Sequence, residues 1–152
     1  MSFYTKFVAS LLFPLHERLK GHNSVAVRQH MEQAQWLPPD QLGALQSRNL
    51  REFLQDVGTN VPYYRDLFQS LGFDPATVTS AADLQRLPFL TKSVIRANTG
   101  ALKHTQAKGL ARFNTGGSSG EPLIFFIGNK RVSHDVAAKW RATRWWGVDI
   151  GD

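Results

Sequence analysis

Prolines and glycines divide the first hundred residues into short segments, and the positions of these residues most limit what the chain can fold into. Proline cannot donate a backbone N–H inside a helix, and glycine commonly ends one. Between these breaks the apolar residues recur at helical spacing, so the sequence predicts many short helices and not a bundle. The breaks fall at Pro14, Gly21, Pro38, Pro39, Gly58, Pro62, Gly72 and Pro88.

The first predicted helix covers Phe3 to Leu19, with a kink or break at Pro14 and an end at Gly21. Its apolar run, Phe7 to Leu15, is far too short to span a membrane. We therefore expect a buried or docking helix here, and interfacial anchoring is the alternative.

Capping residues predict where the next two helices begin. Ser24 is expected to cap a helix that runs to about Trp36, and Asp40 a helix that runs to Val57 and ends at Gly58. The second is the clearest pattern in the chain. Its apolar residues follow the helical period at Leu42, Leu45, Leu50, Phe53, Leu54 and Val57.

Three further short helices are predicted before Gly100. Pro62 suits the first turn of a helix with an aromatic face, which Gly72 closes, and we expect these aromatic rings in the core. Ser80 and Asp83 form a capping-box pattern for a brief helix before Pro88. Thr91 is expected to cap a helix that continues to Ala97.

After Gly100 the pattern changes to strands, so the predicted fold class is α/β. Leu110 to Asn114 and Leu123 to Ile127 are expected to form two strands joined by a loop. A helix follows, whose apolar stripe should pack on the strands: Val132, Val136, Trp140 and Thr143. No repeat and no shift of composition marks a second domain.

The loop between the strands, FNTGGSSGEP from Phe113 to Pro122, favours phosphate binding. Glycines let backbone N–H groups approach a polyanion, and Thr115, Ser118 and Ser119 add hydroxyl donors. The alternative is a glycine-serine hairpin or linker without a ligand. Other phosphate-loop and nucleophile motifs fail: no Lys-Ser or Lys-Thr pair follows Gly120, and neither the dinucleotide nor the Gly-x-Ser-x-Gly spacing fits.

Thr115 to Pro122, TGGSSGEP, resembles the phosphate-binding signature of the adenylate-forming superfamily. Gly116 stands where that pattern often has serine, and Leu123 where many relatives have lysine. Three other segments resemble the phenylacetate-coenzyme A ligase-like branch, which includes capsular-polysaccharide and coenzyme-synthetase relatives. They are VPYYRDLF (Val61 to Phe68), DLQRLPFLTKSVIRAN (Asp83 to Asn98) and WWGVDIGD (Trp145 to Asp152).

The resemblance implies that residues 1–152 are an incomplete N-terminal portion of an AMP-binding domain, mostly helical over 1–100 and strand-loop-strand-helix over 101–152. It implies ATP with Mg²⁺, a carboxylic acid substrate and coenzyme A as acceptor. In this family the acyl pocket, the ribose-binding carboxylate and the catalytic lysine lie downstream of the matched part, so no catalytic residue and no independent turnover are expected here. The residues implied to bind the phosphates are Thr115, Gly116, Gly117, Ser118, Ser119 and Gly120.

Two rival functions stay open: a non-catalytic nucleotide-binding remnant or scaffold, and a basic nucleic-acid-binding domain. The formal net charge is +6, but the 18 Lys and Arg residues are scattered along the chain. The densest basic stretch, Asn129 to Arg144, is expected to be the solvated face of a helix. Nucleic-acid binding is therefore not our expectation.

Histidines and cysteines give little support to metal or redox chemistry. The five histidines are isolated, so no zinc site is expected, and His134 is expected to be buried and hydrogen-bonded. No cysteine is present, which fits the cytoplasm. Because Phe125, Phe126, Trp145 and Trp146 would lose packing partners in a partial domain, we expect a marginally stable, adhesive protein.

Overall fold

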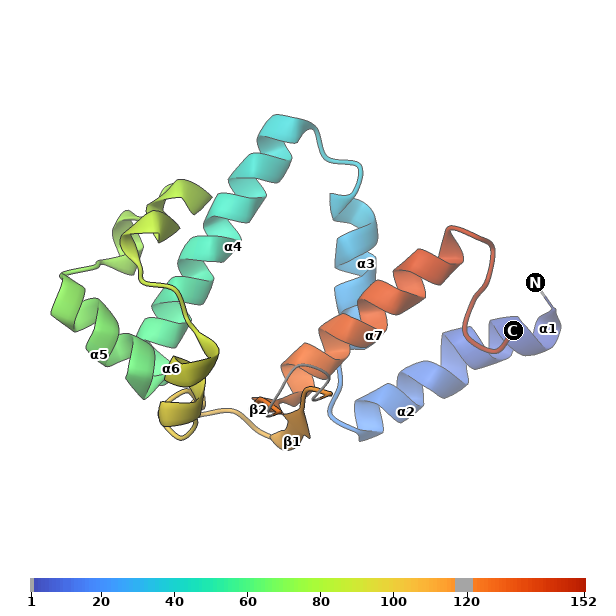
Figure 1. Cartoon of the computed structure of the whole chain (residues 1–152). Helices are drawn as coiled ribbons and strands as arrows, with labels where there is room; N and C mark the ends of the chain where they lie inside the picture. Colours follow the sequence, from blue (N-terminus) through green and yellow to red (C-terminus); the bar gives the residue numbers. More distant parts are fainter. Residues whose placement is uncertain (1, 117–121) are drawn as a thin grey trace. The chain divides into compact units, whose positions relative to one another are not determined.

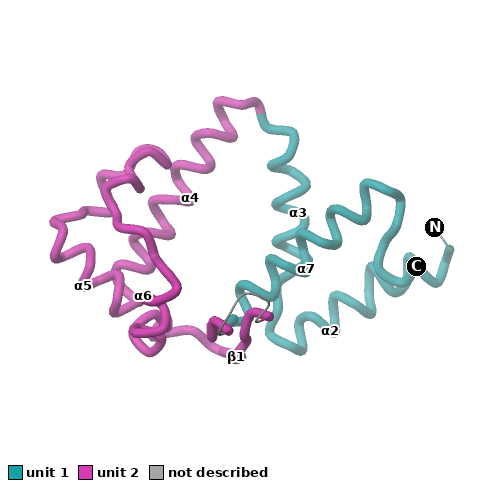
Figure 2. The backbone as a smooth tube through the Cα atoms, viewed as in Figure 1, with its two compact units in different colours: residues 1–37, 127–152 teal, residues 38–126 magenta. Residues whose placement is uncertain are grey.

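The structure, a computed structural model, describes residues 2–116 and 122–152. It is mostly helical with one small antiparallel two-stranded sheet, which is compatible with a mixed α/β fold. Two compact units divide the chain: residues 1–37 with 127–152, and residues 38–126 (Figure 2). The first unit therefore joins the two ends of the sequence.

Figure 1 shows the elements in chain order. The regular segments are α1 (Phe3–Phe7), η1 (Val8–Leu12), α2 (Phe13–Leu19), α3 (Ser24–Ala34), α4 (Pro39–Asn60), α5 (Pro62–Leu71), η2 (Pro75–Thr77), η3 (Ala81–Arg86), α6 (Lys92–Ala97), β1 (Ala111–Asn114), β2 (Ile124–Ile127) and α7 (Asn129–Arg144). Here η1 is a π-helical segment, and η2 and η3 are 3₁₀ helices. Among the described residues, no helix is long and apolar enough to cross a membrane.

The predicted helix over Phe3 to Leu19 is confirmed as one helical run, α1–η1–α2. Its irregularity precedes Pro14, whose nitrogen cannot donate to the preceding turn, and the backbone widens there into the π-helical segment η1. Gly21 ends the run as predicted, with φ of 72°. Its N–H donates to Arg18 O at 3.0 Å, and the N–H of His22 donates to Glu17 O at 2.8 Å, which is a Schellman motif.

Ser24 does not cap α3, so that prediction is wrong. Asn23 occupies the cap position, and Ser24 is the first helical residue. The Ser24 hydroxyl is fully buried and donates to the carboxylate of Glu17. The hydroxyl that was predicted to cap the helix therefore bonds a residue of another helix instead. The helix α3 ends at Ala34, two residues before the predicted end at Trp36.

Both ends of α4 differ from the prediction. The helix begins at Pro39 with Pro38 as its cap residue, so Asp40 lies inside the first turn. It passes through Gly58 and ends at Asn60. Val61 ends it, because the residue before a proline is pushed out of the helical region, and Val61 has φ −114° and ψ 106°.

The core of the unit formed by residues 38–126 lies where α4 meets α5. Phe68 is 5% exposed, and Tyr63 and Tyr64 pack against the same cluster, which confirms the expected aromatic core. The buried members of the cluster are Leu54, Val57, Val61, Phe68, Phe73 and Val78. Gly58 permits this approach, because a Cβ there would lie 2.9 Å from Phe68 Cδ2.

The caps predicted at Ser80 and Thr91 are confirmed. Ser80 and Asp83 form a reciprocal capping box on η3, which is a 3₁₀ helix. The hydroxyl of Thr91 accepts the N–H of Val94 at 3.3 Å at the start of α6. Local side-chain chemistry therefore sets the start of both segments.

The helix α7 packs against α3 within the same unit (Figure 1), and its packing on the strands stays a prediction. Its buried residues are Ser133, Ala137 and Trp140. Of the expected stripe, only Trp140 is buried. Small residues at 133 and 137 let the two helices come close, so the packed face contains fewer large apolar residues than the pattern assumed.

Candidate functional site

The predicted phosphate loop is held between β1 and β2. At its base the N–H of Thr115 donates to Leu123 O at 3.0 Å, and the N–H of Leu123 donates to the Thr115 hydroxyl oxygen at 3.0 Å. Thr115 thus joins both ends of the loop with its backbone and its side chain. The loop is therefore fixed at its base as part of a hairpin.

In the contacts of the described residues, the hydroxyl of Thr115 acts as an acceptor. Its oxygen accepts from Leu123, but a hydroxyl also carries one hydrogen that can be donated. The bond from Leu123 limits the directions in which that hydrogen can point. Thr115 is therefore suited both to closing the hairpin and to donating to an anion.

Gly116 is not required by the local backbone. Among the described residues, no atom would lie within 4 Å of a Cβ placed there, and the φ of Gly116 does not lie in the left-handed region. The serine that the superfamily pattern often has at this position would therefore fit. The other four predicted site residues lie outside the described residues, so their role stays a prediction: Gly117, Ser118, Ser119 and Gly120.

The two faces of the hairpin carry different side chains. Phe113 and Phe125 stack across the strands, with ring centroids 6.1 Å apart and planes at 22°. Phe126 points to the opposite face, where the ammonium of Lys103 lies 3.9 Å from its ring centroid. Phe125 and Phe126 are therefore half-buried, although we expected them to lack packing partners.

Lys103 is a cation beside the strand that follows the loop, and sequence reasoning did not single it out. It lies in the connection between α6 and β1, more than twenty residues before Phe126 in the chain. No local motif marks it, because its place over the ring depends on the tertiary fold. It is a candidate for supplying positive charge near this sheet.

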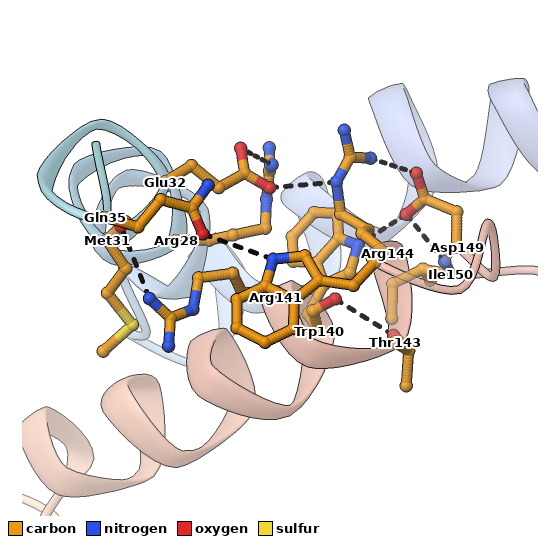
Figure 3. Close-up of polar contacts among 11 residues, drawn as sticks. Arg28, Met31, Glu32, Gln35, Trp140, Arg141, Thr143, Arg144, Asp149 and Ile150 are labelled. Carbon is orange, nitrogen blue, oxygen red and sulfur yellow. Dashed lines mark hydrogen bonds and ion pairs between the residues drawn. The ribbon is translucent and has the colours of Figure 1, made fainter.

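The basic stretch on α7 is only in part a solvated face. Lys130, Arg131 and Lys139 are exposed, as expected. Arg144 instead bridges two carboxylates: its Nε lies 2.9 Å from Glu32 on α3, and its terminal nitrogen pairs with Asp149 (Figure 3). This arginine holds its own unit together, which removes one cation from any nucleic-acid surface.

Asp149 is the buried centre of this network. It is 7% exposed and accepts hydrogen bonds from the Trp140 indole and the Ile150 N–H, beside its pair with Arg144. Three donors to one carboxylate compensate the cost of its burial. Part of the WWGVDIGD segment is thus anchored to α7.

Asp152 ties the same segment to α1. The N–H of Asp149 and the Thr5 hydroxyl donate to its side chain, at 2.8 Å and 2.7 Å. These two bonds lower the pKa of the Asp152 carboxyl below its ordinary value of 3.8. The segment Trp145 to Asp152 therefore has a structural role within its unit, which its sequence did not predict.

The histidines do not converge on a metal. His134 is exposed, so the prediction that it is buried is wrong. His22 pairs with Glu17 at 3.3 Å and His104 with Asp56 at 3.2 Å. Within residues 2–116 and 122–152, no three metal-ligating side chains are grouped closely enough to hold an ion.

Comparison with known proteins gives partial similarity to phenylacetate-coenzyme A ligases. The chain is 30% identical over 115 residues to such a ligase of Aromatoleum evansii, covering 74% of this chain and 26% of the relative. It is 38% identical over 60 residues to the phenylacetate-coenzyme A ligase of Thermus thermophilus, and the match covers 40% of this chain and 14% of the relative. It is 26% identical over 93 residues to protein CapK of Staphylococcus aureus, and the match covers 61% of this chain and 20% of the relative. No protein-family model matches the sequence.

The chain spans about a quarter or less of the length of these relatives. The similarity supports a phenylacetate-coenzyme A ligase-like chain. It agrees with the resemblance found in the sequence motifs. That this chain takes part in the activity of these relatives is a proposal, which is argued below.

Proposed function

We propose that this chain supplies the phosphate-binding part of an ATP-dependent acid-thiol ligase, within the large domain of an adenylate-forming enzyme of the phenylacetate-coenzyme A ligase-like branch. The single observation that carries this proposal is the 30% identity over 74% of the chain to one such ligase. The hairpin closed by Thr115 supports it, since a loop with a fixed base suits a polyanion.

In this proposal Thr115, Gly116, Gly117, Ser118, Ser119 and Gly120 wrap the β- and γ-phosphates of ATP. Mg²⁺ accompanies the nucleotide and offsets its charge. A carboxylate oxygen of the acid attacks the α-phosphorus, and the bond to pyrophosphate breaks. The thiol of coenzyme A then attacks the acyl carbon and displaces AMP. The loop holds the leaving pyrophosphate group in position.

The 152 residues alone are proposed to bind ATP without turning it over. Adenylation needs positioned cations around the α-phosphate, and the loop supplies hydroxyl and backbone donors instead. We assign the protein to the cytoplasm because a chain without cysteines needs no oxidising compartment.

The test is isotope exchange between pyrophosphate and ATP, with the product of the whole reading frame that contains this chain. Phenylacetate and a panel of other carboxylic acids are each supplied. At least one acid should support exchange, and Ser118→Ala with Ser119→Ala should reduce it. Ser70→Ala is the matched control, since this exposed serine lies on α5 and its hydroxyl donates to Leu67 O in the same helix.

Three results separate the alternatives. ATP binding without exchange for any acid would favour the non-catalytic nucleotide-binding remnant or scaffold. Binding of DNA that weakens steeply with added salt would favour the basic nucleic-acid-binding domain. Loop variants that leave both exchange and ATP affinity unchanged would contradict the proposed site.

A further inference from the structure

The helical run α1–η1–α2 buries two polar residues and exposes most of its large apolar residues. Thr5 is 2% exposed and Glu17 is 5% exposed. A helix on the surface of a globular protein normally has the opposite arrangement. The exposed apolar side chains, here called the outer face, are Phe3, Tyr4, Phe7, Leu11, Leu12, Leu15 and Leu19.

The polar residues on the inner side are bonded within their own unit. The Thr5 hydroxyl donates to Asp152 at 2.7 Å, and Glu17 accepts from Ser24 and pairs with His22 at 3.3 Å. Phe13 packs edge-on against Trp140, with centroids 5.1 Å apart. Turning the helix to bury the outer face would expose or unpair these groups, so the orientation of the run within its unit is fixed.

Within residues 2–23, the charged side chains that reach solvent are all basic. Lys6, Arg18 and Lys20 are exposed. Between Ser2 and Asn23 the one carboxylate is Glu17, which is buried and bonded inward. The solvent side of this run therefore combines large apolar side chains with cations and carries no acidic residue.

We propose that the run α1–η1–α2 is an interfacial anchor that lies on an anionic lipid surface. The outer face enters the boundary between headgroups and acyl chains, and Lys6, Arg18 and Lys20 contact lipid phosphates. Among the described residues no helix is long and apolar enough to cross a membrane, and this run carries its apolar residues on one face, so it lies in the plane of the surface. The charge complementarity selects anionic lipid, because an uncharged surface would leave the three cations unpaired.

Co-sedimentation with lipid vesicles tests this anchor directly. The 152-residue chain should bind vesicles of phosphatidylcholine mixed with phosphatidylglycerol, bind phosphatidylcholine alone weakly, and dissociate as salt is added. Phe7→Glu combined with Leu11→Glu should reduce binding more than about tenfold. Lys6→Gln combined with Lys20→Gln should reduce it about tenfold on the mixed vesicles only.

Phe53→Glu is the matched control. Phe53 is 59% exposed but lies on α4, in the other unit, so its charge should not change vesicle binding. Circular dichroism checks that every variant keeps its helices. Equal losses for Phe53→Glu and for the outer-face variant would show general adhesiveness and would overturn the proposal.

A spin label gives the position of the outer face. The chain has no cysteine, so Leu11→Cys and Phe53→Cys each accept one nitroxide label without further changes. Only the label at position 11 should gain oxygen accessibility on the mixed vesicles. Absence of vesicle binding would contradict the proposal. So would a lipid-free dimer that Leu11→Glu dissociates, because a second copy would then cover this face.

Discussion

Two glycines of α4 show how one residue can fix the spacing of two helices. Gly58 faces the ring of Phe68, where an added Cβ would lie 2.9 Å from Cδ2, and Phe68 is itself buried. Gly43, in the same helix, has no atom within 4 Å of such a Cβ. The close contact of α4 with α5 therefore depends on Gly58 and not on Gly43.

Alanine at these two positions should change stability in opposite directions. Gly43→Ala should stabilise the protein by about 0.5–1 kcal/mol, because alanine is the better helix former. Gly58→Ala should destabilise it by about 1–2 kcal/mol, because overpacking against Phe68 outweighs that gain. Denaturant unfolding measures both. Equal stabilisation by the two substitutions would show that Gly58 is not a spacing residue.

At the candidate site, the sequence predicted which residues form the loop but not the hydrogen bonds and ring contacts that they make. Thr115 was predicted as a phosphate donor from the loop composition, and the structure adds that its oxygen closes the hairpin. Lys103 was missed because its contact with Phe126 joins distant parts of the chain. Long-range contacts of this kind leave no pattern in a short window of sequence.

Among the elements, segment types were predicted well where proline, glycine and capping residues act locally. Gly21, Gly72 and the capping box at Ser80 and Asp83 lie where predicted. The errors arose where tertiary contacts compete with local preference. Ser24 bonds Glu17 instead of capping α3, and α7 buries a face of small residues against α3.

The cap of η3 makes a pH-dependent prediction. Backbone N–H groups of Thr79 and then Ser80 donate to the Asp83 carboxylate and lower its pKa below the ordinary 3.8. A lowered folded pKa means that the stabilisation is present above pH 3.8 and is lost as the pH falls through the folded pKa. Asp83→Asn should therefore destabilise the protein at neutral pH, and its difference from the parent should vanish in stronger acid.

Denaturant unfolding at a series of pH values checks this. Asp66→Asn is the control, because Asp66 is 70% exposed and pairs only with its neighbour Arg65 among the contacts described. It should change stability little at any pH. A constant difference between Asp83→Asn and the parent across the whole series would contradict the cap as the cause.

At the scale of the whole molecule, exposed apolar side chains dominate the expected behaviour. Trp145 and Trp146 are 65% and 85% exposed, as predicted, and Trp36 and Phe89 are 83% and 93% exposed. They occur in both compact units. The 152-residue chain should therefore bind a hydrophobic dye and unfold irreversibly on heating. A sharp, reversible thermal transition from a monomer, measured by calorimetry, would contradict this.

The central claim is that the loop of residues 115–120 binds the phosphates of ATP. Equilibrium titration of the 152-residue chain with ATP and Mg²⁺ tests it most directly, because it needs no downstream chemistry. Ser118→Ala combined with Ser119→Ala should weaken binding about tenfold, by removing two hydroxyl donors, while Ser70→Ala should leave it unchanged. No measurable binding, or equal affinity for all three proteins, would contradict the account.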